Sequence, residues 1–565
     1  MWIERRIFLY RKDDLLPKRR TKLCQNAEKC FFGKIRISIM GFFFSFYYLV
    51  FINQWSIMVV LTKGVKYMGF SKDFLWGGAT AANQYEGGVF EGGAGLATAD
   101  VMTNGSHTVR RQVTWKKEDG TTGSTPLCFG SDERHLPEGA IPCLLDDDKY
   151  YYPSHIASDF YHHYKEDIKL CAEEGFNCFR LSIKWSRIYP NGDDAEINEE
   201  GINFYKSVFE ECKKYGIEPV VTLLHYETPL SLAQRFNGWD DRRLVDLYVR
   251  YAETCFDRFE CLCKYYLTFN EINCIEAAPY VTAGLIHADE QNIANATFHQ
   301  FLASAKTVIS AHKNHPDIKV GMMLAFGPVY GYTCDPYDQL LAKQQEDRTL
   351  FYSDVQMTGV YPNYKLKEYE RDGITIPSQD GDFETLKEGV CDFLSFSCYG
   401  SHVQTTHMED DMQKGEGNGA MQRTVANPYL KTNAWGWATD PQCLRIALNT
   451  FYNRYHCDLF CVENGIGWND TFEDDTVHDD YRIDYMRANI QSMKDAVEYD
   501  GIPLMGYLYW GCVDMVSNGE GEMAKRYGQI YVDADNYGQG SMVRKVKDSY
   551  HWYQKCIKSN GEDLK

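Results

Sequence analysis

Short apolar runs alternate with amphipathic helical stretches from residue 74 to the end of the chain. This alternation is typical of a parallel sheet whose strands are covered on both faces by helices. Eight such runs can close a (β/α)8 TIM barrel of the α/β class, and we predict a single domain of this kind. Helices are expected at 157–174 and 199–215. The predicted strands are 74–82, 178–185, 218–224, 263–269, 319–326, 393–398, 459–462 and 504–509.

Chain length does not by itself require a barrel. With 565 residues, 44% of them apolar, the chain could also form two or three smaller domains. The prediction of one barrel therefore depends on the alternating pattern. Two polar stretches, 96–152 and 408–429, are rich in glycine, threonine or charge and are expected to be loops on the barrel rim.

Two of the apolar runs end in a glutamate. The run 459–462 is followed by Glu463, Asn464 and Gly465, and the run 263–269 is followed by Asn270 and Glu271. Because parallel barrel strands have their carboxyl ends on one rim, both glutamates are expected there. The other rim candidates are Gln84, Arg180, His225, Asn270, Tyr399 and Trp510.

The first 67 residues differ from the rest of the chain. They contain 13 Lys/Arg against 4 Asp/Glu, and an apolar run spans 39–52. This segment is either a signal anchor with positive flanks or an extension upstream of the true start at Met68. We favour the extension, because Met68 directly precedes the first strand. The barrel domain is then 68–560, and the protein is expected to be cytoplasmic without a membrane partner.

Charge and cysteine content limit the classes of ligand. The net charge of -20 argues against nucleic acid, and an anionic substrate would require local positive charge at the site. The 19 cysteines are odd in number and scattered, which favours reduced thiols. No second half of a zinc site accompanies Cys261 and Cys263, so we expect neither a metal nor another cofactor.

Two facing carboxylates suit glycosidic bond hydrolysis. In retaining enzymes they lie about 5 to 5.5 Å apart, one as the nucleophile and the other as the acid and then the base. The nucleophile must be ionised and the acid protonated when the substrate binds. Such a pair needs a cation and hydrogen-bond donors beside the nucleophile.

The sequences TFNEIN at 268–273 and VENG at 462–465 resemble the two catalytic motifs of glycoside hydrolase family 1. The resemblance extends over 69–557. It implies that Glu271 is the acid/base and that Glu463 is the nucleophile. It further implies that Asn270 binds the sugar 2-hydroxyl and that Arg180 and Tyr399 keep Glu463 ionised. Gln84, His225 and Trp510 would bind the glycone.

Three departures from the commonest family pattern bear on the substrate. Ser397 stands where an Asn is usual, so the contact made by that Asn is in question. Ser517 replaces the Glu that binds the glycone hydroxyls in members acting on plain sugars. Ser517, Lys525 and Tyr527 resemble the phosphate-binding set of 6-phospho-β-glycosidases. Asn518 stands where phospho-β-galactosidases usually carry Trp, which favours a glucoside.

The resemblance therefore implies a retaining 6-phospho-β-glucosidase that releases glucose 6-phosphate from cellobiose 6-phosphate or aryl β-glucoside 6-phosphates. Its partner is a small phosphorylated β-glucoside, supplied by a sugar phosphotransferase system, and a homo-oligomer is left open. One alternative is an unphosphorylated β-glucosidase, and another is a 6-phospho-β-galactosidase. A catalytically silent, membrane-anchored sugar-binding protein is the alternative from a different class. Trp435 and Trp437 fit either core packing or an aglycone platform.

Overall fold

The computed structural model describes residues 50–52, 55–57, 69–408, 414–415, 424–433 and 435–565. The chain divides into two units, Met1–Met68 and Gly69–Lys565. In the first unit, β1 (Val50–Ile52) pairs antiparallel with β2 (Trp55–Ile57). The rest of the predicted anchor segment 39–52 lies outside the described residues, and the start at Met68 stays a prediction. Among the described helices, none is long and apolar enough to cross a membrane.

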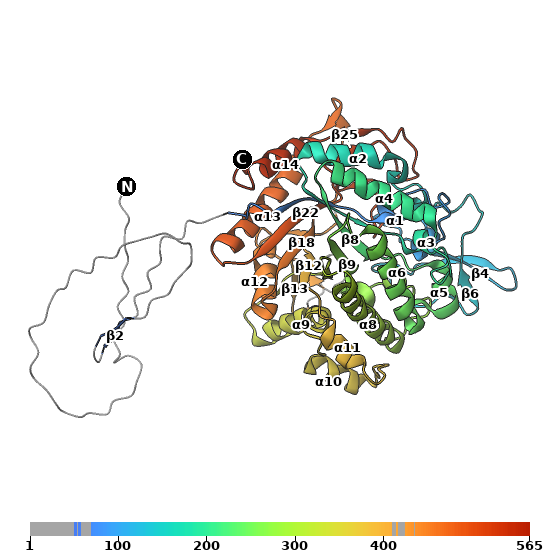
Figure 1. The fold of residues 1–565 in the computed structure, drawn as a ribbon, viewed down its shortest axis with the longest axis horizontal. Coiled ribbons are helices and arrows are strands. Elements are labelled where there is room, and N and C mark those ends of the chain that lie inside the picture. The colour runs from blue at the N-terminus through green and yellow to red at the C-terminus, as the bar shows by residue number, and fades with distance from the viewer. Residues whose placement is uncertain (1–49, 53–54, 58–68, 409–413, 416–423, 434) are drawn as a thin grey trace, which may run out of the picture. The chain divides into compact units, whose positions relative to one another are not determined.

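Within the described residues, eight parallel strands close a barrel in the second unit, as predicted (Figure 1). Neighbours in the chain are neighbours in the barrel, and the last strand pairs with the first. All eight predicted apolar runs contribute a strand. The strands are β3 (Leu75–Ala79), β7 (Cys178–Ser182), β8 (Glu218–Leu224), β9 (Tyr265–Phe269), β10 (Lys319–Ala325), β12 (Phe393–Ser397), β18 (Leu459–Asn464) and β22 (Leu504–Trp510).

The predicted boundaries were wrong at several strand ends. The runs 74–82 and 178–185 stop early, because the chain turns over the rim into α1 (Ala82–Tyr85) and α3 (Trp185–Ile188). The backbone N–H of Ala82 donates to Ser182 Oγ at 2.8 Å and stabilises this turn. The runs 319–326 and 393–398 each end one residue early, and 263–269 begins two residues late.

Two strands instead run further than predicted. β18 includes Glu463 and Asn464, because Glu463 is in register with Ser397 and Asn464 with Tyr509. β22 includes Trp510, which is in register with Ala79 of β3. In these two strands, pairing with neighbouring strands therefore continues past the end of the apolar run.

An outer helix follows each barrel strand. In α4, Asn198 caps the first turn by accepting from Glu200 N, Glu199 and Glu200 lie at the amino end, and lysines lie at the carboxyl end. The helix predicted at 157–174 begins only at Phe160, because Ala157 and Asp159 have φ of 50° and 55°. The eight helices are α2 (Phe160–Glu174), α4 (Glu199–Lys214), α6 (Arg243–Phe259), α8 (Glu290–Asn314), α9 (Pro336–Thr358), α12 (Cys443–Tyr455), α13 (Asp480–Glu498) and α14 (Asp548–Lys558).

The polar stretch 96–152 forms a small antiparallel sheet in the order β5-β4-β6. Its strands are β4 (Val113–Lys117), β5 (Thr122–Thr125) and β6 (Ala140–Pro142). Figure 1 shows β4 and β6 beside α5 (Leu230–Phe236), where Gln234 Nε2 donates to the carbonyl of Pro142 at 2.8 Å. A second apolar cluster, which includes Trp115 and Tyr226, joins this sheet to the barrel rim.

The other predicted rim loop, 408–429, falls largely outside the described residues. In its described part, β14 (Lys414–Gly415) pairs with β15 (Thr424–Val425). Two further helices, α10 (Asn363–Asp372) and α11 (Asp382–Glu388), follow α9 and precede β12 in the chain.

Glycine permits the close approach of the first two barrel strands. A Cβ on Gly77 would lie 1.8 Å from the carbonyl oxygen of Cys178, which pairs with it in register. This spacing is far below van der Waals contact, so only glycine fits there. The close approach places the carboxyl ends of β3 and β7 side by side on the rim.

Candidate active site

The two predicted catalytic glutamates are buried on the same rim. Glu463 lies near the end of β18, and Glu271 is the second residue after the end of β9. Ser397, at the end of β12, links them, because it is in register with Glu463 and its Oγ donates to Glu271 Oε1 at 2.5 Å. The barrel therefore brings together two carboxylates that are far apart in the chain.

Glu463 is held by the cation and the hydroxyl that the sequence predicts. Arg180 Nη1 forms an ion pair and hydrogen bond with Glu463 Oε1, and Tyr399 OH donates to Oε2 at 2.8 Å. Two further bonds fix the guanidinium: Nε donates to Thr222 Oγ1 at 2.9 Å and Nη2 donates to Asn270 Oδ1 at 2.6 Å. The carboxylate therefore has a defined orientation.

Burial has the largest effect on the charge of Glu463. Burial and the charge of Glu271 raise the pKa of this carboxyl, Arg180 and Tyr399 lower it, and together they bring it to about 7. The contacts from Arg180 and Tyr399 thus act against a large desolvation cost.

Glu271 has an unusual backbone and two hydroxyl donors. Its φ of 38° lies in the left-handed region, which costs about 1 to 3 kcal/mol for a residue other than glycine. Tyr226 OH donates to Glu271 Oε2, and Ser397 donates to Oε1. Sequence reasoning missed Tyr226 as a partner, although it adjoins His225. It noted Ser397 only as a replacement for Asn.

Several buried polar atoms at this rim have no hydrogen-bond partner among the described residues. They include His225 Nδ1 and Asn270 Nδ2. Buried polar atoms are usually paired, so a ligand with hydroxyl groups suits this space. Burial, followed by the Arg180 charge, lowers the pKa of His225 well below its usual range, which keeps the imidazole neutral.

Aromatic and amide side chains flank these atoms. The ring of Trp510 stacks on His225, with centroids 5.6 Å apart and an angle of 21° between the planes. Gln84, predicted to bind the glycone, donates from Nε2 to the carbonyl of Val516 at 2.7 Å. Its amide nitrogen is therefore engaged with the loop that leads to Ser517.

The predicted phosphate lysine pairs with the chain segment that follows the strand of Glu463. Lys525 belongs to β23 (Lys525–Arg526), which pairs antiparallel with β19 (Trp468–Asn469). Lys525 is only 1% exposed and Arg526 8%, which excludes a solvated surface pair. Arg526 is committed to Asp514, at 2.8 Å from its Nη1.

Tryptophan side chains connect this lysine to the support of Glu463. Lys525 Nζ lies 4.4 Å from the ring centroid of Trp437 and 5.0 Å from that of Trp435. Trp437 in turn contacts Tyr399, with ring centroids 5.5 Å apart. The two tryptophans therefore cover the lysine at the rim.

A carboxylate that the sequence analysis did not single out completes this group. Ser517 Oγ donates to Glu520 Oε2, and Lys525 Nζ donates to Glu520 Oε1 at 3.0 Å. Glu520 lies three residues after Ser517, a spacing that could have signalled it. Tyr527 is buried nearby; burial raises its pKa well above its usual range, and the charges of Glu520, Glu463 and Glu271 add to this.

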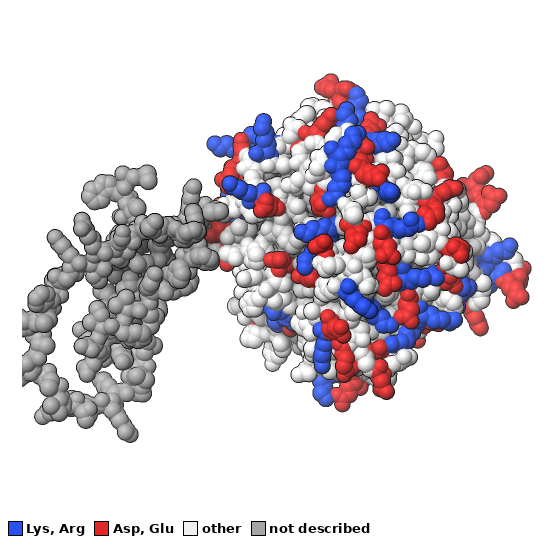
Figure 2. Space-filling view, in the orientation of Figure 1, with Lys and Arg blue, Asp and Glu red and all other residues white. Residues whose placement is uncertain are grey.

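Charge on the molecular surface is mixed in sign. Figure 2 shows acidic and basic side chains interspersed over the face in view. Arg180 and Lys525 are buried cations, and each is paired with a carboxylate, Arg180 with Glu463 and Lys525 with Glu520.

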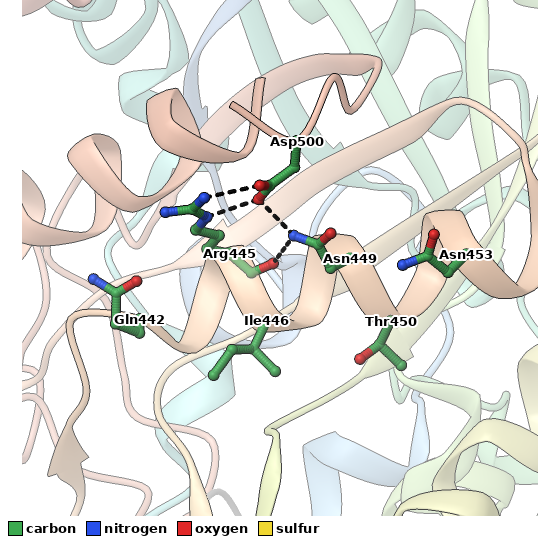
Figure 3. A pocket seen from close by; sticks show the side chains of 7 residues that line it. All are labelled: Gln442, Arg445, Ile446, Asn449, Thr450, Asn453 and Asp500. Atoms are coloured by element: carbon green, nitrogen blue, oxygen red, sulfur yellow. Dashed lines mark hydrogen bonds and ion pairs between the residues drawn. The ribbon is translucent and has the colours of Figure 1, made fainter. Parts of the chain in front are cut away.

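A surface pocket on α12 lies apart from these residues (Figure 3). Arg445 binds Asp500 through two hydrogen bonds of 2.7 and 2.8 Å, and Asn449 Nδ2 also donates to Asp500 at 2.8 Å. The predicted site residues are not among those that line it. The lining residues are Gln442, Arg445, Ile446, Asn449, Thr450, Asn453 and Asp500.

The 17 cysteines of the described part are free, and most are buried. Burial raises the pKa of the Cys391 thiol to about 12, for example, which makes it a poor nucleophile. Among the described residues, no group of three or more His, Cys, Asp and Glu could hold a metal ion.

Comparison with known proteins agrees with this geometry. Residues 66–123 and 146–562 match the profile of Glycosyl hydrolase family 1, with the gap inside the inserted sheet region. The aryl-phospho-beta-D-glucosidase BglA of Bacillus subtilis is 44% identical over 503 residues, covering 87% of this chain and 99% of that protein. The 6-phospho-beta-glucosidase AscB of Escherichia coli is 45% identical over 500 residues, covering 88% and 99%.

A solved structure supports the same assignment. The family 1 β-glucosidase of Thermotoga maritima superposes with a TM-score of 0.70 at 26% identity, covering 88% of this chain and 99% of that one. The family profile covers far more than half of the sequence, and both catalytic motifs fall within it. The chain therefore belongs to glycosyl hydrolase family 1 and is a glycoside hydrolase.

Proposed function

We propose that this glycoside hydrolase is a retaining 6-phospho-β-glucosidase. The observation that carries the proposal is the buried Lys525 at the rim, joined through Trp437 and Tyr399 to Glu463. Lys525 supplies a positive charge at this buried position, and a phosphoryl group on the sugar is an anion that such a cation binds. The printed names of the two bacterial relatives point to the same class of substrate.

The proposed reaction proceeds in two displacements. The Glu463 carboxylate attacks the anomeric carbon, the bond from that carbon to the glycosidic oxygen breaks, and Glu271 gives its proton to the leaving oxygen. Glu271 then takes a proton from water, whose oxygen attacks the anomeric carbon and releases Glu463. Two inversions give net retention, and glucose 6-phosphate leaves.

The unpartnered atoms of the rim support the proposed binding of the glycone. Asn270 Nδ2 donates to the 2-hydroxyl, and His225 Nδ1 binds another ring hydroxyl. The ring of Trp510 covers the apolar face of the sugar, and Gln84 positions the loop before Ser517. Arg180 and Tyr399 orient Glu463 throughout.

The phosphoryl group is assigned to Ser517, Lys525 and Tyr527. Lys525 supplies the charge, and the two hydroxyls supply hydrogen bonds. Asn518, whose Oδ1 accepts from Asn83 Nδ2 at 3.3 Å, is smaller than the Trp of phospho-β-galactosidases and leaves room for the 4-hydroxyl of a glucoside. Because uptake of β-glucosides through a phosphotransferase system yields such substrates inside the cell, we place the enzyme in the cytoplasm.

An unphosphorylated β-glucosidase is the second candidate. The observation that favours it is Glu520, whose carboxylate accepts from both Ser517 and Lys525 and could instead bind sugar hydroxyls. The two candidates differ in the charge of the substrate at one position.

A direct comparison of two substrates tests the proposal. The protein starting at Met68 is assayed with para-nitrophenyl β-D-glucoside and with its 6-phosphate, and kcat/KM is measured for each. We expect at least a hundredfold preference for the 6-phosphate, the factor that one strong charged contact provides at about 2.7 kcal/mol. A preference for the plain glucoside would refute the phosphorylated substrate and support the second candidate.

A further inference from the structure

Glu520 lies inside the group of residues assigned to the phosphoryl group. Its two carboxylate oxygens accept one hydrogen bond each, Oε2 from Ser517 Oγ and Oε1 from Lys525 Nζ at 3.0 Å. Ser517 and Lys525 are 3% and 1% exposed. A resident carboxylate therefore uses two of the donors that the proposed function gives to the substrate.

The electrostatic environment of Glu520 favours the ionised form. Burial acts to raise its pKa, but the charge of Lys525 and the bonds from Ser517 and Lys525 outweigh burial and lower it. Its charge also acts on the buried Arg111 and on Glu522. Glu520 is therefore an anion that neutralises Lys525 when no phosphoryl group is bound.

The backbone around Glu520 is anchored on both sides. Arg111 Nη1 donates to the carbonyl of Asn518 at 2.8 Å, and Asn536 Oδ1 accepts from the N–H groups of Met523 and Ala524 at 2.9 and 2.8 Å. These contacts fix the loop. The Glu520 side chain, with three rotatable bonds, is the part that can change place without moving the loop.

A phosphoryl group and the Glu520 carboxylate cannot both bind these donors. A phosphate monoester carries about -1.5 to -2 charges at pH 7, so the two anions would repel each other around one ammonium group. Binding of the 6-phosphate thus requires the Glu520 side chain to leave. A plain glucoside carries no such charge and leaves Glu520 in place.

We propose that Glu520 is an intramolecular competitor of the substrate phosphoryl group for Ser517 and Lys525. The proposal rests on the proposed function. It makes Glu520 a residue that determines specificity, because its displacement weakens binding of every 6-phosphorylated substrate while plain glucosides are spared. When no substrate is bound, the Glu520 carboxylate neutralises the buried charge of Lys525, which would otherwise be costly.

Replacing Glu520 by glutamine tests this competition. Glu520→Gln keeps the size of the side chain and removes its charge. We expect KM for para-nitrophenyl β-D-glucoside 6-phosphate to fall about tenfold, with kcat little changed, because a charged competitor for two donors is lost. Inhibition by inorganic phosphate should strengthen by a similar factor, and KM for the plain glucoside should not fall.

The matched control is Glu522→Gln, which removes the same charge two residues further along the loop. Glu522 accepts from the Ser517 N–H through its backbone carbonyl, which the substitution keeps, so its replacement should leave KM for the 6-phosphate near the parent value. If both variants lowered KM for the 6-phosphate equally, the loss of one negative charge near the site would explain the result, and the proposal would be overturned. Glu520→Ser serves as a second variant, and circular dichroism of each variant reports that it is folded.

A rise in KM for the 6-phosphate in Glu520→Gln would also overturn the proposal, since Glu520 would then assist binding of the phosphoryl group. Failure of the proposed function looks different. In that case the parent enzyme itself prefers the plain glucoside, and Glu520→Gln raises KM for that substrate because a ligand of its hydroxyls is lost.

Discussion

Replacing Tyr399 by phenylalanine should shift the pH at which the enzyme loses activity in acid. Glu463 must be ionised to attack, and burial raises its pKa to about 7, so kcat/KM should fall as the pH drops through about 7. Tyr399 OH donates to Glu463 Oε2 at 2.8 Å and stabilises the carboxylate. Without it, the ionised form loses a hydrogen bond to a charged group.

The size of the shift follows from that hydrogen bond. A hydrogen bond to a charged group contributes about 1.5 to 3 kcal/mol, and one pKa unit corresponds to about 1.36 kcal/mol. Water that enters the space of the hydroxyl recovers part of this, so we expect the lower end. The acidic limb of Tyr399→Phe should therefore lie about one pH unit above that of the parent enzyme.

The assay follows hydrolysis of para-nitrophenyl β-D-glucoside 6-phosphate and determines kcat/KM across the range from pH 5 to pH 9.5. The phosphate of the substrate titrates near pH 6, but it is the same in both enzymes, so the difference between them reports the protein. Tyr226→Phe is the matched control, because its hydroxyl binds Glu271 and should leave the acidic limb in place. An unshifted limb in Tyr399→Phe, with activity merely lowered, would refute the reasoning.

Three further results are expected. Glu463→Ala should lower kcat by several orders of magnitude with either nitrophenyl substrate, and surviving turnover would contradict its role as nucleophile. Lys525→Gln should raise KM for the 6-phosphate about a hundredfold through loss of a charged contact, while KM for the plain glucoside changes little; parallel changes would contradict the phosphate assignment. Thr222→Val leaves the buried Nε of Arg180 without its 2.9 Å acceptor and should lower the free energy of unfolding in urea by about 1 to 3 kcal/mol; unchanged stability would show that the site relaxes.

The barrel and its two glutamates could be predicted because the signals for them are local. A parallel strand covered on both faces reads as a continuous apolar run, and 218–224 became β8 with no change of boundary. The rim residues come at or just after the ends of such runs, as Asn270 and Glu271 follow β9. The resemblance to the family motifs then assigned chemistry to these positions.

Several strand ends depended on pairing between strands. Ala82 leaves the sheet because its N–H meets Ser182 Oγ on another strand, and Glu463 stays in the sheet because it pairs beside Ser397. An apolar run does not contain this information, since register and rim turns depend on residues distant in the chain.

The sequence by itself determined the fold class, the order of the strands and the identity of two carboxylates at one rim. Only the tertiary structure decided the electrostatic environment and the hydrogen-bond partners of these carboxylates. The pKa of Glu463 reflects burial, Glu271 and Arg180 together, and these meet only in the closed barrel. Likewise, Ser397 reaches Glu271 across 126 residues of chain. Glu520 is near Lys525 in sequence, yet its carboxylate could be placed on Ser517 and Lys525 only once the side chains were folded around them, because desolvation and hydrogen bonding depend on three-dimensional neighbours.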